Sequence, residues 1–262
     1  MIIIQKVGYH MINPMDMTGK TIIVTGASSG IGRATAIQIS QLGGTAILVA
    51  RDSHRLEQTI SKLNHGNHKY YSFDLLNHAG IDSLIKRIVT ENGEINGLAY
   101  CAGIGNRCPS RMLKPEKLLE MLKINSVSFV EAARVLSSTR YRSETASFVC
   151  ISSVASIKGE KGLLAYSMSK GALNSAIRVM AKEFGPYGIR VNAVLPSWIK
   201  TEMAESIFEN YGKGEFDKEM DSVQYLGMGS PIDIANAIVF LLSDAAKFIT
   251  GTELIIDGGY TS

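Results

Sequence analysis

The sequence has no long hydrophobic run. The longest, at 235–242, is interrupted once and is far shorter than the roughly 20 apolar residues that a helix needs to cross a bilayer. The N-terminal run at 1–4 ends at Gln5 and Lys6, so the chain also lacks the apolar stretch of a signal peptide. We therefore expect neither a membrane span nor export.

Cysteine is scarce, and charge of neither sign predominates. Cys101, Cys108 and Cys150 are an odd number without a CxxC pair, which favours a reduced, cytoplasmic chain over a disulfide framework. Cys101 and Cys150 stand in apolar runs and are interpreted as core residues. The net charge of +3 is spread along the chain, unlike the clustered basic footprint of a nucleic-acid-binding protein. None of the five histidines has a cysteine or carboxylate at ligand spacing, so no metal site is expected.

Short apolar runs alternate with longer amphipathic segments along the chain. The apolar runs are rich in Val and Ile, as in strands buried on both faces, and lie at 21–25, 45–50, 69–73, 97–101, 146–151, 189–194 and 253–256. Helix-like segments lie near 31–42, 54–63, 78–91, 115–138, 166–184 and 231–243. This alternation predicts an α/β fold, a doubly wound, Rossmann-type parallel sheet of about seven strands with helices on both faces.

One domain accounts for this pattern, because no repeat, low-complexity segment or linker interrupts it. Residues 1–16 are expected to be an N-terminal extension, and residues 17–262 a single domain. The true start methionine is left open between Met1, Met11, Met15 and Met17.

A glycine-rich turn follows the first predicted strand and opens the first predicted helix. Gly26 allows a tight turn, Gly30 lets the backbone approach a pyrophosphate, and Gly32 permits close packing of helix on sheet. The helix N-terminus then offers N–H groups and a positive dipole end to phosphates. A plain strand-to-helix turn is the alternative interpretation, but the position after the first strand favours a dinucleotide site.

Tyr166 and Lys170 stand four residues apart on one predicted helix and therefore share a face. The helix begins at the carboxyl edge of the strands, where open α/β sheets bind ligands. The ordinary pKa of a phenol is about 10, and a neighbouring ammonium lowers it by stabilising the phenolate. The pair is thus suited to exchanging a proton with a carbonyl or alcohol oxygen.

Together these features resemble the single-domain short-chain dehydrogenase/reductase family. The TGxxxGxG turn, the YxxxK pair, Ser153 thirteen residues before Tyr166, and Asn125 forty-one residues before it all match the family's pattern. The resemblance covers about residues 19–259, and it is closest to 3-oxoacyl-[acyl-carrier-protein] reductases. The TGxxGxxG turn of the extended, sugar-nucleotide-modifying branch is not present.

The resemblance implies a catalytic role for each of these four residues. Tyr166 would protonate the substrate oxygen, and Ser153 would hold that oxygen by a hydrogen bond. Lys170 would bind the nicotinamide ribose and tune Tyr166. Asn125 would support a water that links Lys170 to bulk solvent. Ser152 is the alternative to Ser153, but the spacing favours Ser153.

NADP(H) is the implied cofactor. Arg51 follows Ala50, which holds the position where NAD enzymes carry an acid, and an arginine there accommodates a 2′-phosphate. The alternative is that Arg51 caps a surface loop and Asp52 contacts the ribose. Asp74 matches the residue that hydrogen-bonds the adenine ring. The expected cofactor-binding residues are Gly26, Ser28, Ser29, Gly30, Ile31, Gly32, Arg51, Asp74, Leu75, Ala102, Gly103, Tyr166, Lys170, Pro196, Ile199 and Thr201.

Two positions depart from the family's pattern. Tyr100 and Cys101 replace the usual Asn-Asn before Ala102 and Gly103, which puts the local stability of the sheet in doubt more than the chemistry. Ser197 replaces the usual glycine, and it is expected to narrow the pocket or change its backbone geometry.

Substrate choice is expected to rest on segments 154–164 and 202–228. The second is interpreted as an amphipathic lid, packed on the core or closing over a moderately apolar substrate. Its apolar residues are Met203, Phe208, Tyr211, Phe216, Tyr225 and Met228. The leading substrate is a 3-oxoacyl thioester, free or bound to a carrier protein, and a sugar, polyol or other specialised carbonyl is the alternative. A non-catalytic NADP(H)-sensing protein is the alternative from another class.

Docking of an acidic carrier is left open. Glu144 and Tyr187 hold the places where 3-oxoacyl-[acyl-carrier-protein] reductases carry basic residues for the carrier, although Arg140, Arg142 and Lys182 lie close by. No nucleic acid or membrane partner is expected. Family members associate through the long helices and the last strand, so the resemblance implies a homotetramer or homodimer.

Overall fold

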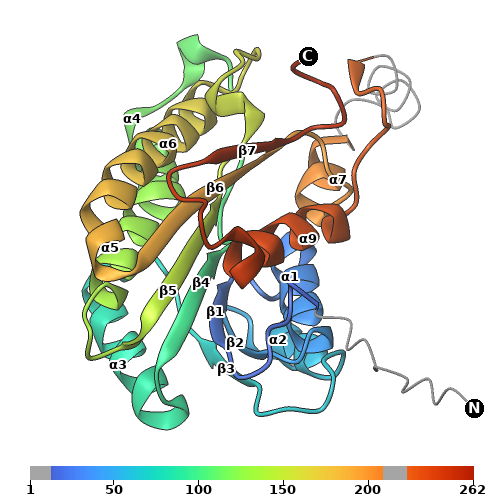
Figure 1. The fold of residues 1–262 in the computed structure, drawn as a ribbon. Coiled ribbons are helices and arrows are strands. Elements are labelled where there is room, and N and C mark those ends of the chain that lie inside the picture. Colours follow the sequence, from blue (N-terminus) through green and yellow to red (C-terminus); the bar gives the residue numbers. More distant parts are fainter. Residues whose placement is uncertain (1–12, 209–222) are drawn as a thin grey trace, which may run out of the picture.

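The computed structural model describes residues 13–208 and 223–262. In these ranges the chain forms a seven-stranded sheet in which all neighbouring strands are parallel, in the order β3-β2-β1-β4-β5-β6-β7 (Figure 1). The strands are β1 Thr21–Thr25, β2 Thr45–Ala50, β3 Lys69–Ser72, β4 Ile95–Tyr100, β5 Arg142–Ile151, β6 Ile189–Pro196 and β7 Glu253–Ile256. The predicted doubly wound α/β fold is confirmed.

Helices cover both faces of the sheet (Figure 1). Helices α1, α2 and α9 lie on one face, and α3, α5 and α6 pack on the other, with α4 beside α6. The helices are α1 Gly30–Gln41, α2 Ser53–Ile60, α3 Ile81–Asn92, α4 Pro115–Leu122, α5 Ser128–Leu136, α6 Leu164–Phe184, α7 Glu202–Phe208 and α9 Pro231–Leu242. Short 3-10 turns lie at His78–Gly80, Ser110–Met112, Val154–Ser156, Gly185–Tyr187 and Asp244–Ala246. None of the described helices is long and apolar enough to span a bilayer.

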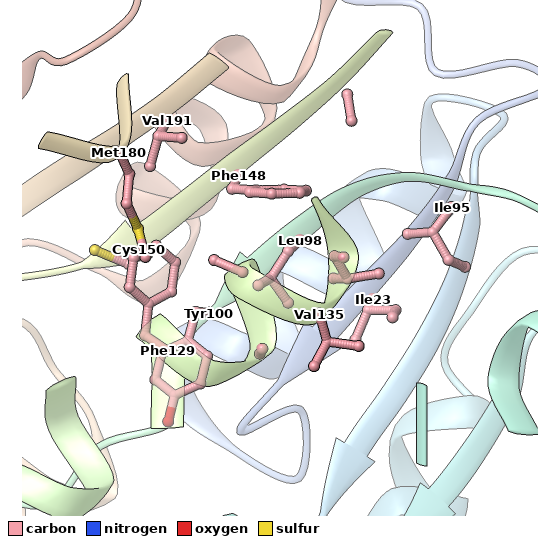
Figure 2. Close-up of a cluster of buried hydrophobic side chains, with 14 of the residues drawn as sticks. Ile23, Ile95, Leu98, Tyr100, Phe129, Val135, Phe148, Cys150, Met180 and Val191 are labelled. Carbon is pink, nitrogen blue, oxygen red and sulfur yellow. The ribbon is translucent and has the colours of Figure 1, made fainter. Parts of the chain in front are cut away.

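The central strands are buried on both faces, which explains why their sequences lack polar alternation. Ile22 and Ile23 are neighbours in β1 and point to opposite faces, yet both are buried. Ile22 belongs to the cluster under α1 and α9. Ile23 belongs to the opposite cluster, with Leu98 of β4 and Val135 of α5 (Figure 2).

The prediction of one continuous helix at 115–138 is wrong. The segment forms two helices, α4 and α5, joined by a π-helical turn at Lys123–Val127. Side-chain contacts stabilise this turn: the Tyr100 hydroxyl donates to the Ile124 carbonyl at 2.7 Å, and Asn125 bonds to the backbone of Ile104. Such turns inside helices often mark functional sites. The remaining elements differ from prediction by a few residues at their ends, the usual scale of boundary error.

The N-terminal side of the described chain packs on the domain. Met17 is fully buried, and the Pro14 carbonyl accepts a hydrogen bond from the Ala245 N–H at 3.1 Å. Residues 1–12 lie outside the described part, and the division between 1–16 and 17–262 stays a prediction.

The strand order creates a crevice at one edge of the sheet. Strands β1 and β4 are neighbours, and the chain winds outward from them in opposite directions, toward β3 and toward β7. In open α/β sheets, ligands bind at this reversal, outside the carboxyl ends of the strands.

Candidate active site

A cavity of about 520 Å³ opens at the carboxyl ends of the strands. Seventeen of the eighteen residues predicted for the site line this cavity, and the exception is Asn125. The predicted residues on the wall are Gly26, Ser28, Ser29, Gly30, Ile31, Gly32, Arg51, Asp74, Leu75, Ala102, Gly103, Ser153, Tyr166, Lys170, Pro196, Ile199 and Thr201. Residues from both halves of the chain thus meet in one place.

The glycine turn after β1 is packed too closely to admit side chains. Gly26 has a φ of 64°, and a Cβ on it would lie 2.9 Å from the backbone nitrogen of Ala102. A Cβ on Gly32 would collide with the Gly26 carbonyl oxygen. The Thr25 hydroxyl oxygen accepts from the N–H groups of Cys101 and Ala102, both at 3.1 Å, and so fastens the loop after β4 to the turn.

The start of α1 is open toward the cavity. Among the described residues, no side-chain hydrogen bond from its N-cap, Ser29, covers the first N–H groups. Free N–H groups at a helix N-terminus bind phosphate. On the opposite wall, Thr201 faces the turn, because a Cβ on Gly30 would lie 3.4 Å from the Thr201 methyl group. The cradle therefore has the shape and polarity that a dinucleotide needs.

The end of β2 presents a cation and an acid side by side, Arg51 and Asp52, and both line the cavity. Arg51 is exposed and lines the cavity, directly after the side chain of Ala50. The Asp52 carboxylate caps α2 by accepting from the Arg55 N–H at 3.0 Å. Asp74, after β3, also lines the cavity, and its carboxylate accepts from the Leu76 N–H at 3.0 Å.

Lys170 is held between α6 and β5. Its ammonium nitrogen donates to the Ile151 carbonyl at 2.7 Å and lies 5.6 Å from the centre of the Tyr166 ring. The side chain is 3% exposed, and this burial lowers the pKa of Lys170 to about 8. Burial raises the pKa of Tyr166, the neighbouring Ser153 hydroxyl opposes that rise, and the charge of Glu160 adds to it.

The two adjacent serines after β5 have different surroundings. The Ser152 hydroxyl donates to the Asn174 side-chain oxygen at 2.6 Å, on the buried side of α6. The Ser153 hydroxyl caps the following 3-10 turn, accepting from the Ala155 N–H at 3.1 Å and donating to the Pro196 carbonyl at 3.4 Å, and it lies near enough to the Tyr166 phenol to lower its pKa. The structure thus brings Ser153, the residue favoured by spacing, next to Tyr166.

Asn125 lies behind the cavity wall and does not line it. Its amide nitrogen donates to the Ile104 carbonyl at 2.9 Å, and its oxygen accepts from the Ile104 N–H at 2.8 Å. A Cβ on Gly103 would lie 3.2 Å from the Asn125 side-chain oxygen and 3.5 Å from the Lys170 nitrogen, so Gly103 stands between these two groups. The water-supporting role implied by the resemblance stays a prediction.

Tyr100 and Ser197, which depart from the family's pattern, both make local contacts in the structure. The Tyr100 ring packs edge-on against Phe129 with ring centres 5.5 Å apart (Figure 2), and its hydroxyl is bonded to Ile124. The Ser197 hydroxyl donates to the Gln224 side-chain oxygen at 2.8 Å and to the Asp257 carbonyl at 3.1 Å. The structure therefore gives both replacements hydrogen-bonding partners.

A charged cluster beside Tyr166 was not predicted. Glu160 lines the cavity and pairs with Arg107 at 3.0 Å, and it accepts from the Tyr260 hydroxyl at 2.5 Å. The Arg107 guanidinium lies over the Trp198 ring, 5.3 Å from its centre. Four loops that follow β4, β5, β6 and β7 are joined here. No sequence spacing signals the cluster, because its members are far apart in the chain.

The segment predicted as a lid is described in part. Met203 lines the cavity, and Met228 packs with Trp198 around Ala204. Glu202 of α7 pairs with Arg55 of α2 across the cavity. Tyr225 is exposed, whereas the Phe208 side chain, Tyr211 and Phe216 lie outside the described part of the chain.

Comparison with known proteins identifies similar chains over nearly the whole length. A family profile described as "Enoyl-(Acyl carrier protein) reductase" matches residues 26–261. The 3-oxoacyl-[acyl-carrier-protein] reductase of Escherichia coli is 31% identical, covering 94% of this chain and 98% of the relative. The 2,5-dichloro-2,5-cyclohexadiene-1,4-diol dehydrogenase of Sphingobium indicum is also 31% identical, covering 94% and 99%.

Solved structures share the fold. A 3-oxoacyl (acyl-carrier-protein) reductase from Agrobacterium tumefaciens with NADP bound has a TM-score of 0.86 at 22% identity, covering 97% of this chain and 100% of that one. A 7α-hydroxysteroid dehydrogenase complexed with NADH has a TM-score of 0.87 at 24% identity, covering 95% and 98%. These structures hold different coenzymes on one fold. Because the family profile and relatives of 31% identity match nearly the whole chain, this chain belongs to the short-chain dehydrogenase/reductase family of NAD(P)(H)-dependent oxidoreductases.

Proposed function

We propose that the protein reduces a carbonyl to a secondary alcohol with NADPH, and that its substrate is a 3-oxoacyl thioester. The observation that carries the proposal is the position of Ser153, Tyr166 and Lys170 on the wall of the cavity that the glycine turn at Gly26 and Gly32 also forms. Proton-transferring groups and a dinucleotide cradle thus share one site.

The described residues fit NADP(H). The turn at Gly26 and the open start of α1 suit the pyrophosphate, and Lys170 suits the nicotinamide ribose. The exposed guanidinium of Arg51 suits a 2′-phosphate, and the Asp52 carboxylate beside it, which also lines the cavity, accepts one hydrogen bond from the start of α2. When bound, the coenzyme supplies the hydride that the carbonyl carbon accepts.

The protein's own groups then handle the proton. Ser153 orients the substrate oxygen by a hydrogen bond, and the Tyr166 phenol gives that oxygen its proton as the carbon gains hydride. Lys170 lies close enough to Tyr166 to stabilise the phenolate that remains. The phenol is restored by a proton from solvent.

An acyl substrate is supported by the cavity wall and by the relatives. Several apolar residues line the cavity, among them Ile104, Val154, Leu163, Trp198 and Met203. One of the relatives at 31% identity is a 3-oxoacyl-[acyl-carrier-protein] reductase.

At the edge where an acidic carrier protein would dock, one of the three cations named from the sequence is buried. Arg142 is 4% exposed, and its guanidinium donates to the carbonyl oxygens of Ser137, Ser143, Glu144 and Tyr187. Arg142 is therefore a structural residue and cannot dock an acidic partner. Arg140 and Lys182 are exposed and are the remaining cations of that edge.

A cyclic diol or sugar is the second candidate, and one observation favours it. The Glu160 carboxylate and the exposed Asn106 line the same cavity, and both are groups that bind hydroxyls. A relative at 31% identity is a diol dehydrogenase. This candidate uses the same residues in the oxidative direction.

For assembly we propose a homotetramer or homodimer, with the protein in the cytoplasm. Apolar side chains are exposed on the long helix α6 and on the last strand, among them Met168, Val179 and Ile255. Contact between copies through these elements would bury them. The free cysteines are consistent with a reducing compartment.

The test is an absorbance assay of NADPH and NADH oxidation against a panel of carbonyls, with wild type and Tyr166→Phe. The panel holds a 3-oxobutanoyl thioester, a diketone and several keto-sugars. Turnover that requires Tyr166, prefers NADPH and is highest on the thioester supports the proposal. Preference for a keto-sugar supports the second candidate substrate instead. Tight NADPH binding without turnover on any carbonyl contradicts it and favours a sensing protein.

A further inference from the structure

A second cavity of about 400 Å³ lies next to the catalytic one, and the function proposed above does not use it. The two cavities meet along the segment Ile104–Gly105–Asn106, which lines both. We refer to the second one as the side cavity. Its other lining residues come from the loop before α4, from α4 itself and from the start of α6: Cys108, Met112, Leu113, Lys114, Lys117, Glu120, Met121, Gly162 and Ala165.

The side cavity is apolar inside and charged at its solvent end. Met121 and Ala165 are buried, and Leu113 is half-buried. The charged members are Lys114, Lys117 and Glu120. Both lysines are exposed, and Lys117 pairs with Glu120 at 2.9 Å. An apolar group therefore enters this cavity past charges that remain in water.

The side cavity comes close to the catalytic phenol at Gly105, which lines both cavities. A Cβ on Gly105 would lie 3.5 Å from the Tyr166 ring and 3.5 Å from the Met203 sulfur, so the backbone of Gly105 lies against both. Ala165, on the wall of the side cavity, directly precedes Tyr166 in α6. A substituent of a substrate held at Tyr166 has a short path into the side cavity.

The segment that lines both cavities is held by hydrogen bonds on either side of Gly105. Asn125 binds both the N–H and the carbonyl of Ile104, and the Cys108 N–H donates to the Gly162 carbonyl at 2.8 Å. The cavity is thus largely preformed, and little ordering has to accompany binding. Met112 and Met121 add adaptable, polarisable surface that suits chains of varying length.

We propose that the side cavity binds the apolar tail of the acyl substrate, the part beyond the reacting carbonyl, and sets the preferred chain length. This inference rests on the proposed function, since it concerns the substrate of the same site. Each methylene buried in an apolar cavity raises kcat/KM by about fourfold as long as the chain still finds space.

The test measures chain-length preference in the full-length protein with NADPH. The substrates are 3-oxobutanoyl, 3-oxooctanoyl and 3-oxododecanoyl thioesters of N-acetylcysteamine, together with 2,3-butanedione and 2,3-octanedione. The wild type is compared with Leu113→Trp, which fills the side cavity, and Leu113→Ala, which enlarges it. Leu119→Trp is the matched control, because Leu119 is an exposed residue of α4 outside both cavities.

The wild type should prefer 3-oxooctanoyl over 3-oxobutanoyl substrate by at least about tenfold in kcat/KM. Leu113→Trp should abolish that preference, Leu113→Ala should move the optimum to a longer chain, and Leu119→Trp should behave as wild type. A chain-length profile that is flat in wild type, or identical in all three variants, overturns the inference.

The diketones separate this result from the fate of the proposed function. If no thioester is reduced but 2,3-octanedione is preferred and Leu113→Trp removes that preference, the proposed substrate is wrong and the side cavity still binds an apolar tail. If thioesters are reduced without any effect of Leu113→Trp, the proposed function stands and the side-cavity inference is wrong.

Discussion

The ammonium nitrogen of Lys170 lies 5.6 Å from the centre of the Tyr166 ring, one helical turn away on α6. The same nitrogen donates to the Ile151 carbonyl at the end of β5. Helix and strand together hold a positive charge beside the phenol. Burial lowers the pKa of Lys170 to about 8, so that charge is present at neutral pH and is lost in mildly alkaline solution.

The first prediction concerns stability against pH in the absence of coenzyme. In the unfolded chain Lys170 has the ordinary lysine pKa of 10.5, above the folded value of about 8. The buried charge therefore costs stability below about pH 8, and this cost fades as the pH rises toward 10.5. Between about pH 8 and pH 10.5, the free energy of unfolding of the wild type should rise by about 3 kcal/mol relative to that of Lys170→Met.

Urea denaturation at a series of pH values measures that difference. Lys182→Met is the control, since Lys182 is an exposed lysine of the same helix, and its curve should run parallel to that of the wild type. A gap between wild type and Lys170→Met that stays constant with pH would mean that the lysine keeps its ordinary proton affinity.

The second prediction concerns coenzyme choice. Arg51→Ala should reduce kcat/KM for NADPH by about 10- to 100-fold, the value of a charge-assisted hydrogen bond, and leave that for NADH nearly unchanged. Because Arg51 is exposed, added salt should reduce the difference in kcat/KM for NADPH between wild type and Arg51→Ala. Arg87→Ala, an exposed arginine of α3 away from the cavity, should change neither coenzyme. Equal losses with NADPH and NADH would refute a 2′-phosphate contact.

The third prediction concerns Asn125. Asn125→Ala leaves the Ile104 N–H and carbonyl without their present partners, so the free energy of unfolding should fall by about 2–4 kcal/mol. Denaturation of Asn106→Ala, an exposed position on the same loop, is the control and should match wild type. Wild-type stability in Asn125→Ala would show that water replaces both hydrogen bonds.

The fourth prediction concerns the pH profile of reduction. In the proposed mechanism Tyr166 acts as an acid during reduction, so kcat/KM should fall as the pH rises through the pKa of Tyr166. The Glu160 charge raises that pKa, and Glu160→Gln should therefore move the alkaline limb to lower pH. Arg107→Gln leaves Glu160 without its cation and should move the limb to higher pH. Shifts in the same direction for both variants would indicate general damage to the loop.

The fold and most of the site follow from local patterns. Val- and Ile-rich runs such as β6 predict strands because both faces of the central sheet are buried. The glycine turn is predictable because the positive φ of Gly26 and the contact at Gly32 each exclude a side chain. Tyr166 and Lys170 share a helical face, so their spacing alone brings them together.

Long-range contacts could not be predicted in this way. Arg107, Glu160 and Tyr260 meet only because loops after three different strands converge, and no residue pattern encodes that meeting. The π-helical turn at Lys123–Val127 escaped prediction because the periodicity of its sequence is that of an ordinary helix. Arg142 looked like a surface cation from its neighbours in sequence, whereas its carbonyl partners bury it.

The central claim is that Tyr166 gives the substrate its proton while the surrounding site binds NADPH. Single-turnover reduction of the best carbonyl by enzyme preloaded with NADPH tests it most directly, with wild type and Tyr166→Phe compared at the same coenzyme occupancy. The account predicts that the rate of NADPH oxidation falls by about 10²- to 10⁴-fold in Tyr166→Phe, while NADPH still binds. A rate within a few fold of wild type would contradict the account, because the proton would then come from another group.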